Sequence, residues 1–139
     1  MATQMDPKAT EPTVEQLKAL AEAAWEVRES AYTFGHTKVG AAALSADGEI
    51  FIGCNVEHRF RSHDVHAEVN AITSMITSGR TGLVAVVIAA ERERFTPCGS
   101  CMDWIYQFGG PSCRVGYQSN PGGKITILSA EELMPYYPM

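Results

Sequence analysis

The stretch LVAVVIAA, residues 83–90, decides the fold class of this chain. It is a continuous apolar run rich in Val and Ile, and such runs are typical of a strand that is buried on both faces of a sheet. It is also the longest strongly apolar run in the sequence, and it is far too short to cross a bilayer. We therefore expect a central strand with helices packed on both faces of its sheet.

Helix and strand patterns surround this central strand. Apolar residues recur at helical spacing after the capping-box pair Thr13 and Gln16, and two apolar stretches flank an Asp47-Gly48 turn, which indicates a hairpin. This order predicts an α/β fold, a three-layer α/β/α sandwich with a mixed sheet of about five strands. The predicted helices cover residues 13–31, 66–78, 99–108 and a short segment capped by Ser129, and the other predicted strands cover residues 39–44, 49–54, 113–117 and 124–128.

Size and charge limit the class of function. The chain has 139 residues, and we expect residues 1–12 to form a loose tail and residues 13–139 to form a single domain. Lys and Arg number 11 against 16 Asp and Glu, so the net charge of −5 argues against binding to nucleic acid. The first residues are polar and contain no apolar signal core, which predicts a cytoplasmic protein that does not bind membranes.

Two short motifs, each at the predicted start of a helix, combine residue types that bind metal ions. The first is HAE, residues 66–68, and the second is PCGSC, residues 97–101. Two thiolates on one helical turn and a neutral imidazole supply three ligands to zinc, and the fourth position then stays open for water, as in catalytic sites. We expect His66, Cys98 and Cys101 to bind one Zn²⁺ per chain.

Glu68 lies two residues after His66 and is the predicted catalytic residue. A carboxylate that lies beside the metal without binding it can take a proton from water and deliver it to the substrate. In an alternative interpretation the Cys-x-x-Cys pair is redox-active, or it holds a structural zinc with a fourth ligand from His58 or His63. The combined pattern His-x-Glu and Pro-Cys-x-x-Cys is far more specific than its parts, is known from zinc deaminases and favours catalysis.

Three further stretches extend this pattern over most of the chain: VGAAAL at residues 39–44, GCNVE at 53–57 and ELMPY at 132–136. Together with the zinc motifs, they resemble the cytidine deaminase family in its small, single-domain form. Asn55 and His66 lie eleven positions apart, which is similar to the spacing in deaminases of free nucleosides.

The resemblance implies an activity and the residues that serve it. The activity is zinc-dependent hydrolytic deamination of cytidine or a cytidine-like free nucleoside, with release of ammonia, in pyrimidine salvage and in a homotetramer. Asn55 and Glu57 would hold the ribose hydroxyls, and the N–H of Ala67 and the carbonyl of Thr96 would contact the base. The alternatives are a deaminase of another amino-heterocycle (blasticidin S, guanine or a cyclic guanidine), a tRNA adenosine deaminase and an inactive binding module.

Two departures from the family pattern concern the zinc site. His66 stands where the small tetrameric enzymes usually have Cys, and Val69 stands where they have Arg. The two changes fit each other, because three thiolates would leave the site net negative and call for a cation, whereas a His ligand removes that need.

Other departures concern the substrate pocket. Thr37 replaces an aromatic residue of the family, the pair Met102-Asp103 replaces Arg-Gln, and the loop at residues 58–64 (HRFRSHD) is more charged than its family counterpart. We expect these residues to alter the surroundings of the base and the sugar, with Asp103 available to a cationic substituent of the substrate.

Overall fold

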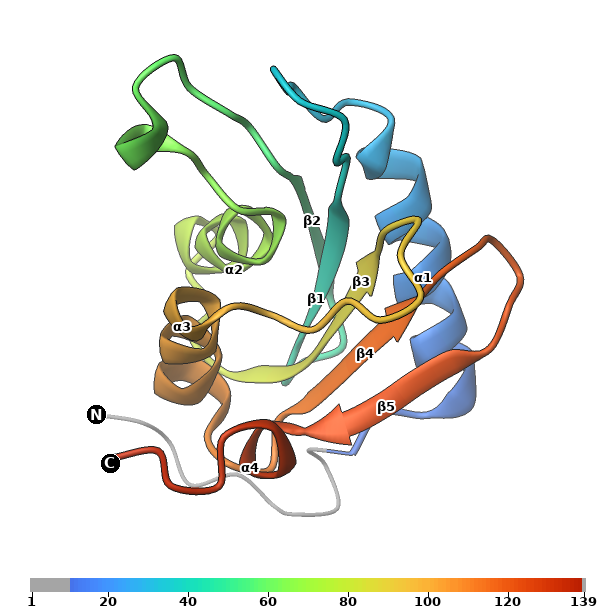
Figure 1. Cartoon of the computed structure of the whole chain (residues 1–139). Helices are drawn as coiled ribbons and strands as arrows, with labels where there is room; N and C mark the ends of the chain where they lie inside the picture. The colour runs from blue at the N-terminus through green and yellow to red at the C-terminus, as the bar shows by residue number, and fades with distance from the viewer. Residues whose placement is uncertain (1–10, 139) are drawn as a thin grey trace.

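A five-stranded mixed sheet forms the middle layer of the structure, a computed structural model that describes residues 11–138 (Figure 1). β3 pairs in parallel with β4, and all other neighbouring strands are antiparallel. The expected mixed sheet is thereby confirmed. In spatial order the strands are β2 (Ile50–Cys54), β1 (Gly40–Ser45), β3 (Leu83–Ala89), β4 (Arg114–Gln118) and β5 (Ile125–Ser129).

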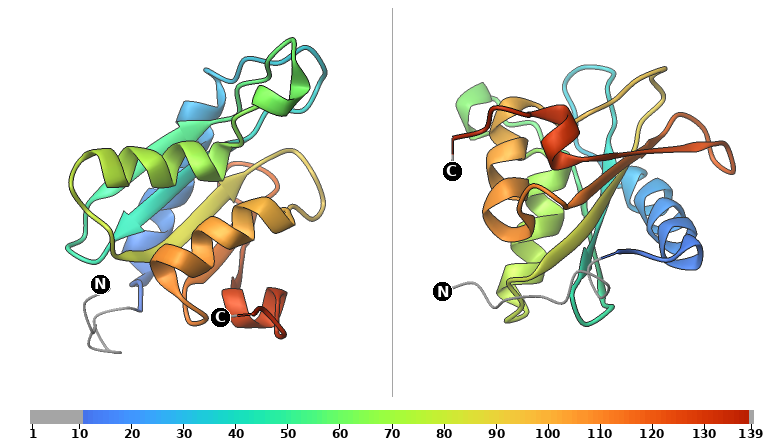
Figure 2. Two further views of the ribbon diagram at one scale, coloured as in Figure 1. Left: turned by 90° about the vertical axis from the view of Figure 1, so that its left-hand side faces the viewer. Right: turned by 90° about the horizontal axis from the view of Figure 1, so that it is seen from below.

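Helices cover both faces of the sheet, as expected for three layers. Figure 2 shows α2 (Ala67–Thr77) and α3 (Gly99–Gly109) side by side on one face, whereas α1 (Val14–Arg28) lies on the other. All seven residues of β3 are buried, and its side chains are divided between two separate apolar clusters, one with α2 and α3 and one with α1. The central position predicted for this strand is confirmed. The short elements are η1 (Arg61–His63) and α4 (Ala130–Leu133).

Two glycines allow the helices to approach the sheet closely. A Cβ atom added to Gly40 would lie 1.9 Å from the carbonyl oxygen of Ala24 in α1, and one added to Gly53 would lie 2.4 Å from the backbone nitrogen of Ala71 in α2. No side chain fits into such a distance, so these positions require glycine. Because Gly53 lies in β2, it fixes the distance between the sheet and the helix that follows His66.

The element boundaries differ from the predicted ones by zero to three residues. The first helix ends at Arg28 instead of residue 31, because Tyr32 forms a bridge with Val56 and its N–H donates to the Asn55 carbonyl at 3.1 Å. The second begins at Ala67, with His66 as its N-cap. The predicted tail, residues 1–12, lies mostly outside the described residues, and the single-domain boundary at residue 13 stays a prediction. Within residues 11–138, no helix is long and apolar enough to span a membrane.

Candidate active site

The strand directions bring the ends of several segments together at one edge of the sheet. Gly40 at the start of β1 pairs with Cys54 at the end of β2 and with Ala89 at the end of β3. The chain segments before β1, after β2 and after β3 therefore meet there, beside the first turns of α2 and α3. A cavity of about 260 Å³ lies at this meeting point, and seven of the eight predicted site residues line it. These are Asn55, Glu57, His66, Ala67, Glu68, Thr96 and Cys98.

The three predicted metal ligands form one cluster. His66 is the N-cap of α2, Cys98 is the N-cap of α3, and Cys101 lies one turn further along α3, where it is fully buried. The Nδ1 atom of His66 lies 3.3 Å from the Sγ atom of Cys101 and 3.4 Å from that of Cys98. All three ligand atoms lie within 4.8 Å of one another, and both cysteines are free thiols.

These distances and donor types fit a zinc ion. Zn–N and Zn–S bonds at a tetrahedral angle place the nitrogen and sulfur atoms about 3.5 Å apart. Burial and then the charge of Glu68 raise the pKa of the Cys101 thiol, so a positive charge is needed for this sulfur to ionise, and a metal ion supplies it. Among the described residues, the metal-ligand cluster contains no fourth His, Cys, Asp or Glu, so one position of a tetrahedral ion is left for water.

Glu68 lies in the first turn of α2 and lines the cavity. Its exposed fraction is 3%, and burial raises the pKa of its carboxyl group above the ordinary value. A buried carboxyl group whose pKa is raised above its ordinary value is suited to take up and release protons. Its distance of two residues from His66 places it beside the metal ligands without making it one of them.

Asn55 and Glu57 follow β2 and are both fixed by backbone groups. The Asn55 side chain accepts a hydrogen bond from the Val39 N–H at 2.8 Å and donates one to the Thr37 carbonyl at 2.9 Å. The Oε1 atom of Glu57 accepts from the N–H groups of residues 34 and 35, at 2.7 and 3.2 Å. The sequence did not predict these bonds, which hold the segment before β1 against the segment after β2.

Ala67 and Thr96 both line this cavity. Ala67 is the first residue of α2, where backbone N–H groups have no partner within the helix, and Thr96 belongs to the segment that leads from β3 to Cys98. The contacts that these two residues are expected to make with a base stay a prediction. A backbone N–H and a carbonyl that line one cavity can together form hydrogen bonds with the edge of a heterocycle.

The comparisons with known proteins agree with this geometry. A family model described as "Cytidine and deoxycytidylate deaminase zinc-binding region" matches residues 14–117. The chain belongs to this family. Zinc is the family's metal, and its members are hydrolases that act on C–N bonds, which fits the donor set formed by His66, Cys98 and Cys101.

Individual relatives in the cytidine and deoxycytidylate deaminase family match over most of their length. A protein named cytidine deaminase from Sporosarcina psychrophila is 34% identical over 112 residues, which are 79% of this chain and 82% of that protein. The crystal structure of a cytidine deaminase from Burkholderia pseudomallei superimposes with a TM-score of 0.78 at 32% identity, over 90% of this chain and 98% of that one. A second crystal structure, from Mycobacterium tuberculosis, gives 0.72 at 26% identity over 85% and 93%.

The structure corrects two expectations about where this chain departs from its family. Met102 is buried in the core, and Asp103 accepts a hydrogen bond from the Tyr137 hydroxyl at 2.7 Å, so neither of them lines the cavity. Successive residues of a helix point about 100° apart, so the side chain after Cys101 faces the core and the next one faces away from the site. Thr37 does line the cavity, as expected.

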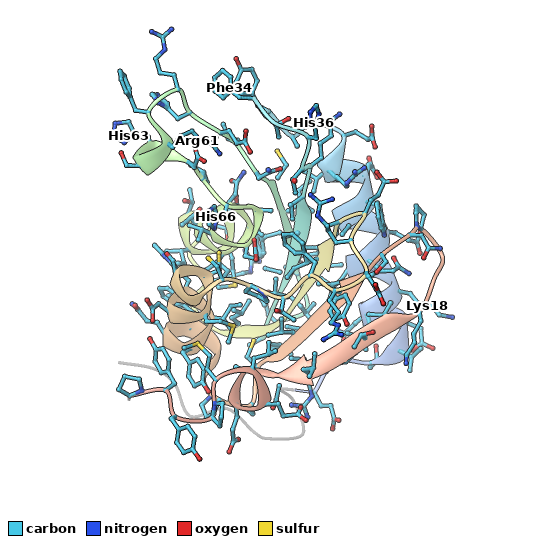
Figure 3. All side chains as sticks on the ribbon, in the orientation of Figure 1. Lys18, Phe34, His36, Arg61, His63 and His66 are labelled. Carbon is cyan, nitrogen blue, oxygen red and sulfur yellow. The ribbon has the colours of Figure 1, made fainter. Side chains whose placement is uncertain are left out.

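The charged loop at residues 58–64 contributes to the cavity in a way that the sequence did not show. Figure 3 shows Arg61 and His63 on the loop that precedes α2, and His66 where α2 begins. Arg61 and Asp64 line the cavity, whereas His58 and His63 pack against each other with ring centres 5.0 Å apart. Neither of these two histidines belongs to the metal-ligand cluster of the described residues, so the alternative of a four-ligand structural site is wrong.

Proposed function

We propose that this chain catalyses the zinc-dependent hydrolytic deamination of cytidine or a cytidine-like free nucleoside. One observation carries the proposal: a metal-ligand cluster, a buried carboxyl group and a pair of polar residues suited to a sugar all meet in one cavity of about 260 Å³. The reaction adds water at the amine-bearing ring carbon and releases ammonia, so cytidine and water give uridine and ammonia.

Glu68 moves the protons of this reaction. When zinc is bound, it supplies the positive charge that polarises water and lowers the pKa of that water. The Glu68 carboxylate accepts a proton from the water and delivers it to the ring nitrogen next to the reacting carbon. It then assists the second proton transfer, to the leaving amine. Burial of Glu68 keeps bulk water from exchanging with these protons.

Ala67 and Thr96 orient the base. In this proposal the Ala67 N–H donates to the carbonyl group of a pyrimidine and the Thr96 carbonyl accepts from its amino group, and the presence of both residues in the cavity wall supports it. Together these contacts point the amine-bearing carbon toward the metal-ligand cluster. A base with the reverse order of donor and acceptor would leave both backbone groups unpaired, which costs about 1–3 kcal/mol for each buried group.

Asn55 and Glu57 bind a hydroxyl group of the sugar. Asn55 already uses its oxygen and one of its two amide hydrogens on the backbone, and the Oε1 atom of Glu57 already accepts two N–H groups. One amide hydrogen of Asn55 and the Oε2 atom of Glu57 remain for the substrate. This pair matches one hydroxyl group that accepts from Asn55 and donates to Glu57.

We further propose a homotetramer that acts in the cytoplasm in pyrimidine salvage. Exposed aromatic surface supports an assembly of subunits: Tyr136 has an exposed fraction of 95%, Phe60 of 62% and Phe34 of 59%. Exposed aromatic side chains of this size are typical of contact surfaces between subunits. Light scattering should give four times the mass of the chain, and a stable monomer at assay concentration would contradict the tetramer.

A screen for ammonia release tests the proposed function. The panel contains cytidine, 2′-deoxycytidine, 3′-deoxycytidine, cytosine, adenosine, guanine and blasticidin S. We expect cytidine to be turned over far better than cytosine, and only one of the two deoxynucleosides to lose most of the activity. A higher kcat/KM for guanine or blasticidin S than for cytidine would replace this proposal with deamination of another amino-heterocycle.

A further inference from the structure

Arg61 lies in the wall of the cavity beside Glu57, and nothing in the proposed chemistry accounts for it. It belongs to a loop whose two ends are tied together, because Val56 and Val65 exchange two backbone hydrogen bonds of 2.8 Å. The loop therefore leaves the sheet after β2, contributes Arg61 to the wall of the cavity and returns directly before His66.

Asp64 fixes the guanidinium group of Arg61 within this loop. The Nε and Nη2 atoms of Arg61 both lie 2.9 Å from the Oδ2 atom of Asp64. The other carboxylate oxygen of Asp64 accepts the N–H of His58 at 2.7 Å. The loop thus holds its own arginine in one orientation, although 61% of the Arg61 side chain is exposed.

The fixed guanidinium group contacts the oxygen that the proposed function assigns to the substrate. Nη2 of Arg61 lies 3.4 Å from Oε2 of Glu57, whose side chain is only 14% exposed. Backbone N–H groups of residues 34 and 35 hold the other oxygen, Oε1. The Glu57 carboxylate is therefore held at both ends, by backbone on one side and by Arg61 on the other.

We propose that Arg61 is a positioning residue for sugar recognition: it holds Oε2 of Glu57 in the orientation that accepts a substrate hydroxyl. This inference rests on the proposed function and narrows it, because it makes selection of a nucleoside over a free base depend on the loop at residues 58–64. Arg61 acts through Glu57 and does not touch the reacting carbon.

Steady-state kinetics of Arg61→Ala with cytidine test this role. A partly exposed ion pair contributes little, so we expect about a fivefold rise in KM with kcat nearly unchanged. Product inhibition separates the sugar from the base: the inhibition constant of uridine should rise by the same factor, and that of uracil should stay constant. Arg61→Lys should raise KM less than Arg61→Ala does, because lysine keeps the positive charge but lacks the planar guanidinium group that binds Asp64.

A matched control and a double variant complete the test. Arg59→Ala removes an arginine of the same loop that does not line the cavity, and its KM should match that of the unmodified chain. In a Glu57→Gln background, Arg61→Ala should add no further rise in KM, because its effect acts through the Glu57 carboxylate.

Three results would overturn the inference while the proposed function stands. They are an unchanged KM in Arg61→Ala, an equal rise in the inhibition constants of uridine and uracil, or an undiminished rise in KM when Arg61→Ala is added to Glu57→Gln. A lack of ammonia release from cytidine by the unmodified chain is a different failure. It would overturn the proposed function and this inference with it.

Discussion

Replacing Glu68 by Gln should abolish turnover without loss of the metal. The side chain has an exposed fraction of 3% and keeps its shape in this substitution, so no cavity opens in the first turn of α2. The amide cannot accept a proton from water and pass it on. His66, Cys98 and Cys101 are untouched, and one zinc ion per chain should remain bound.

The size of the effect follows from the two proton transfers assigned to Glu68. General acid–base catalysis by one group contributes about 10²–10⁴-fold, and the same carboxylate serves twice, so kcat should fall at least about 10³-fold. At 25 °C that is about 4 kcal/mol in the activation barrier. Unlike the activity, the stability of the fold should not decrease. Burial disfavours the ionised carboxylate, so a neutral amide of the same shape should leave the melting temperature equal or slightly higher.

Three measurements on the same preparation check this prediction: kcat with cytidine, zinc content by elemental analysis and the melting temperature. Glu57→Gln is the matched control, because it makes the same chemical change at another wall of the cavity and should raise KM far more than it lowers kcat. Near-normal kcat in Glu68→Gln would refute the assignment of the proton transfers. Loss of zinc in that variant would show that Glu68 supports the metal instead.

Three other perturbations have expected outcomes that follow from single contacts. Cys98→Ala removes one of three ligand atoms and should lose both zinc and activity, as elemental analysis and an ammonia assay will show; a variant with full zinc content would exclude Cys98 as a ligand. Gly53→Ala places a Cβ atom 2.4 Å from the backbone of α2 and should lower the free energy of unfolding by about 1–3 kcal/mol, measured by urea denaturation. The pKa of Asp47 is lowered, first by its hydrogen bond with Ser45 and then by Arg80. Its contribution to stability is therefore complete above the unfolded-state pKa of about 3.9, and it is lost as the pH falls through the lower folded-state pKa. Asp47→Asn should therefore lower the melting temperature above pH 5 and flatten its decline below pH 4, and parallel curves for the two proteins would contradict this.

Local sequence patterns predicted the central strand, the hairpin and the two metal-binding motifs, because each of these is formed by residues that are close together in the sequence. The run at residues 83–90 is apolar on both faces, and β3 is buried on both faces. The Asp47-Gly48 pair forms the expected turn, with Gly48 at a φ of +89°. His66, Cys98 and Cys101 meet because both of their motifs begin helices that pack on the same face of the sheet.

Contacts between distant segments could not be predicted in this way. The end of α1 depends on the bridge from Tyr32 to Val56, a partner 24 positions away that no local pattern reveals. The position of Asp103 in the motif predicts a side chain in the pocket. Asp103 follows Cys101 by two positions in α3, so its side chain points in another direction and accepts a hydrogen bond from Tyr137. For Arg61, the charged loop was visible in the sequence, but its contact with Glu57 required the fold of that loop.

Stepwise zinc reconstitution tests the central claim most directly. Protein stripped of metal with a chelator is titrated with Zn²⁺, and ammonia release from cytidine is measured after each addition. The arrangement of His66, Cys98 and Cys101 predicts that activity starts from near zero, rises in proportion to zinc and stops rising at one ion per chain. Full activity in the stripped protein, or no activity with cytidine at any ratio of zinc to protein, would contradict a zinc-dependent cytidine deaminase.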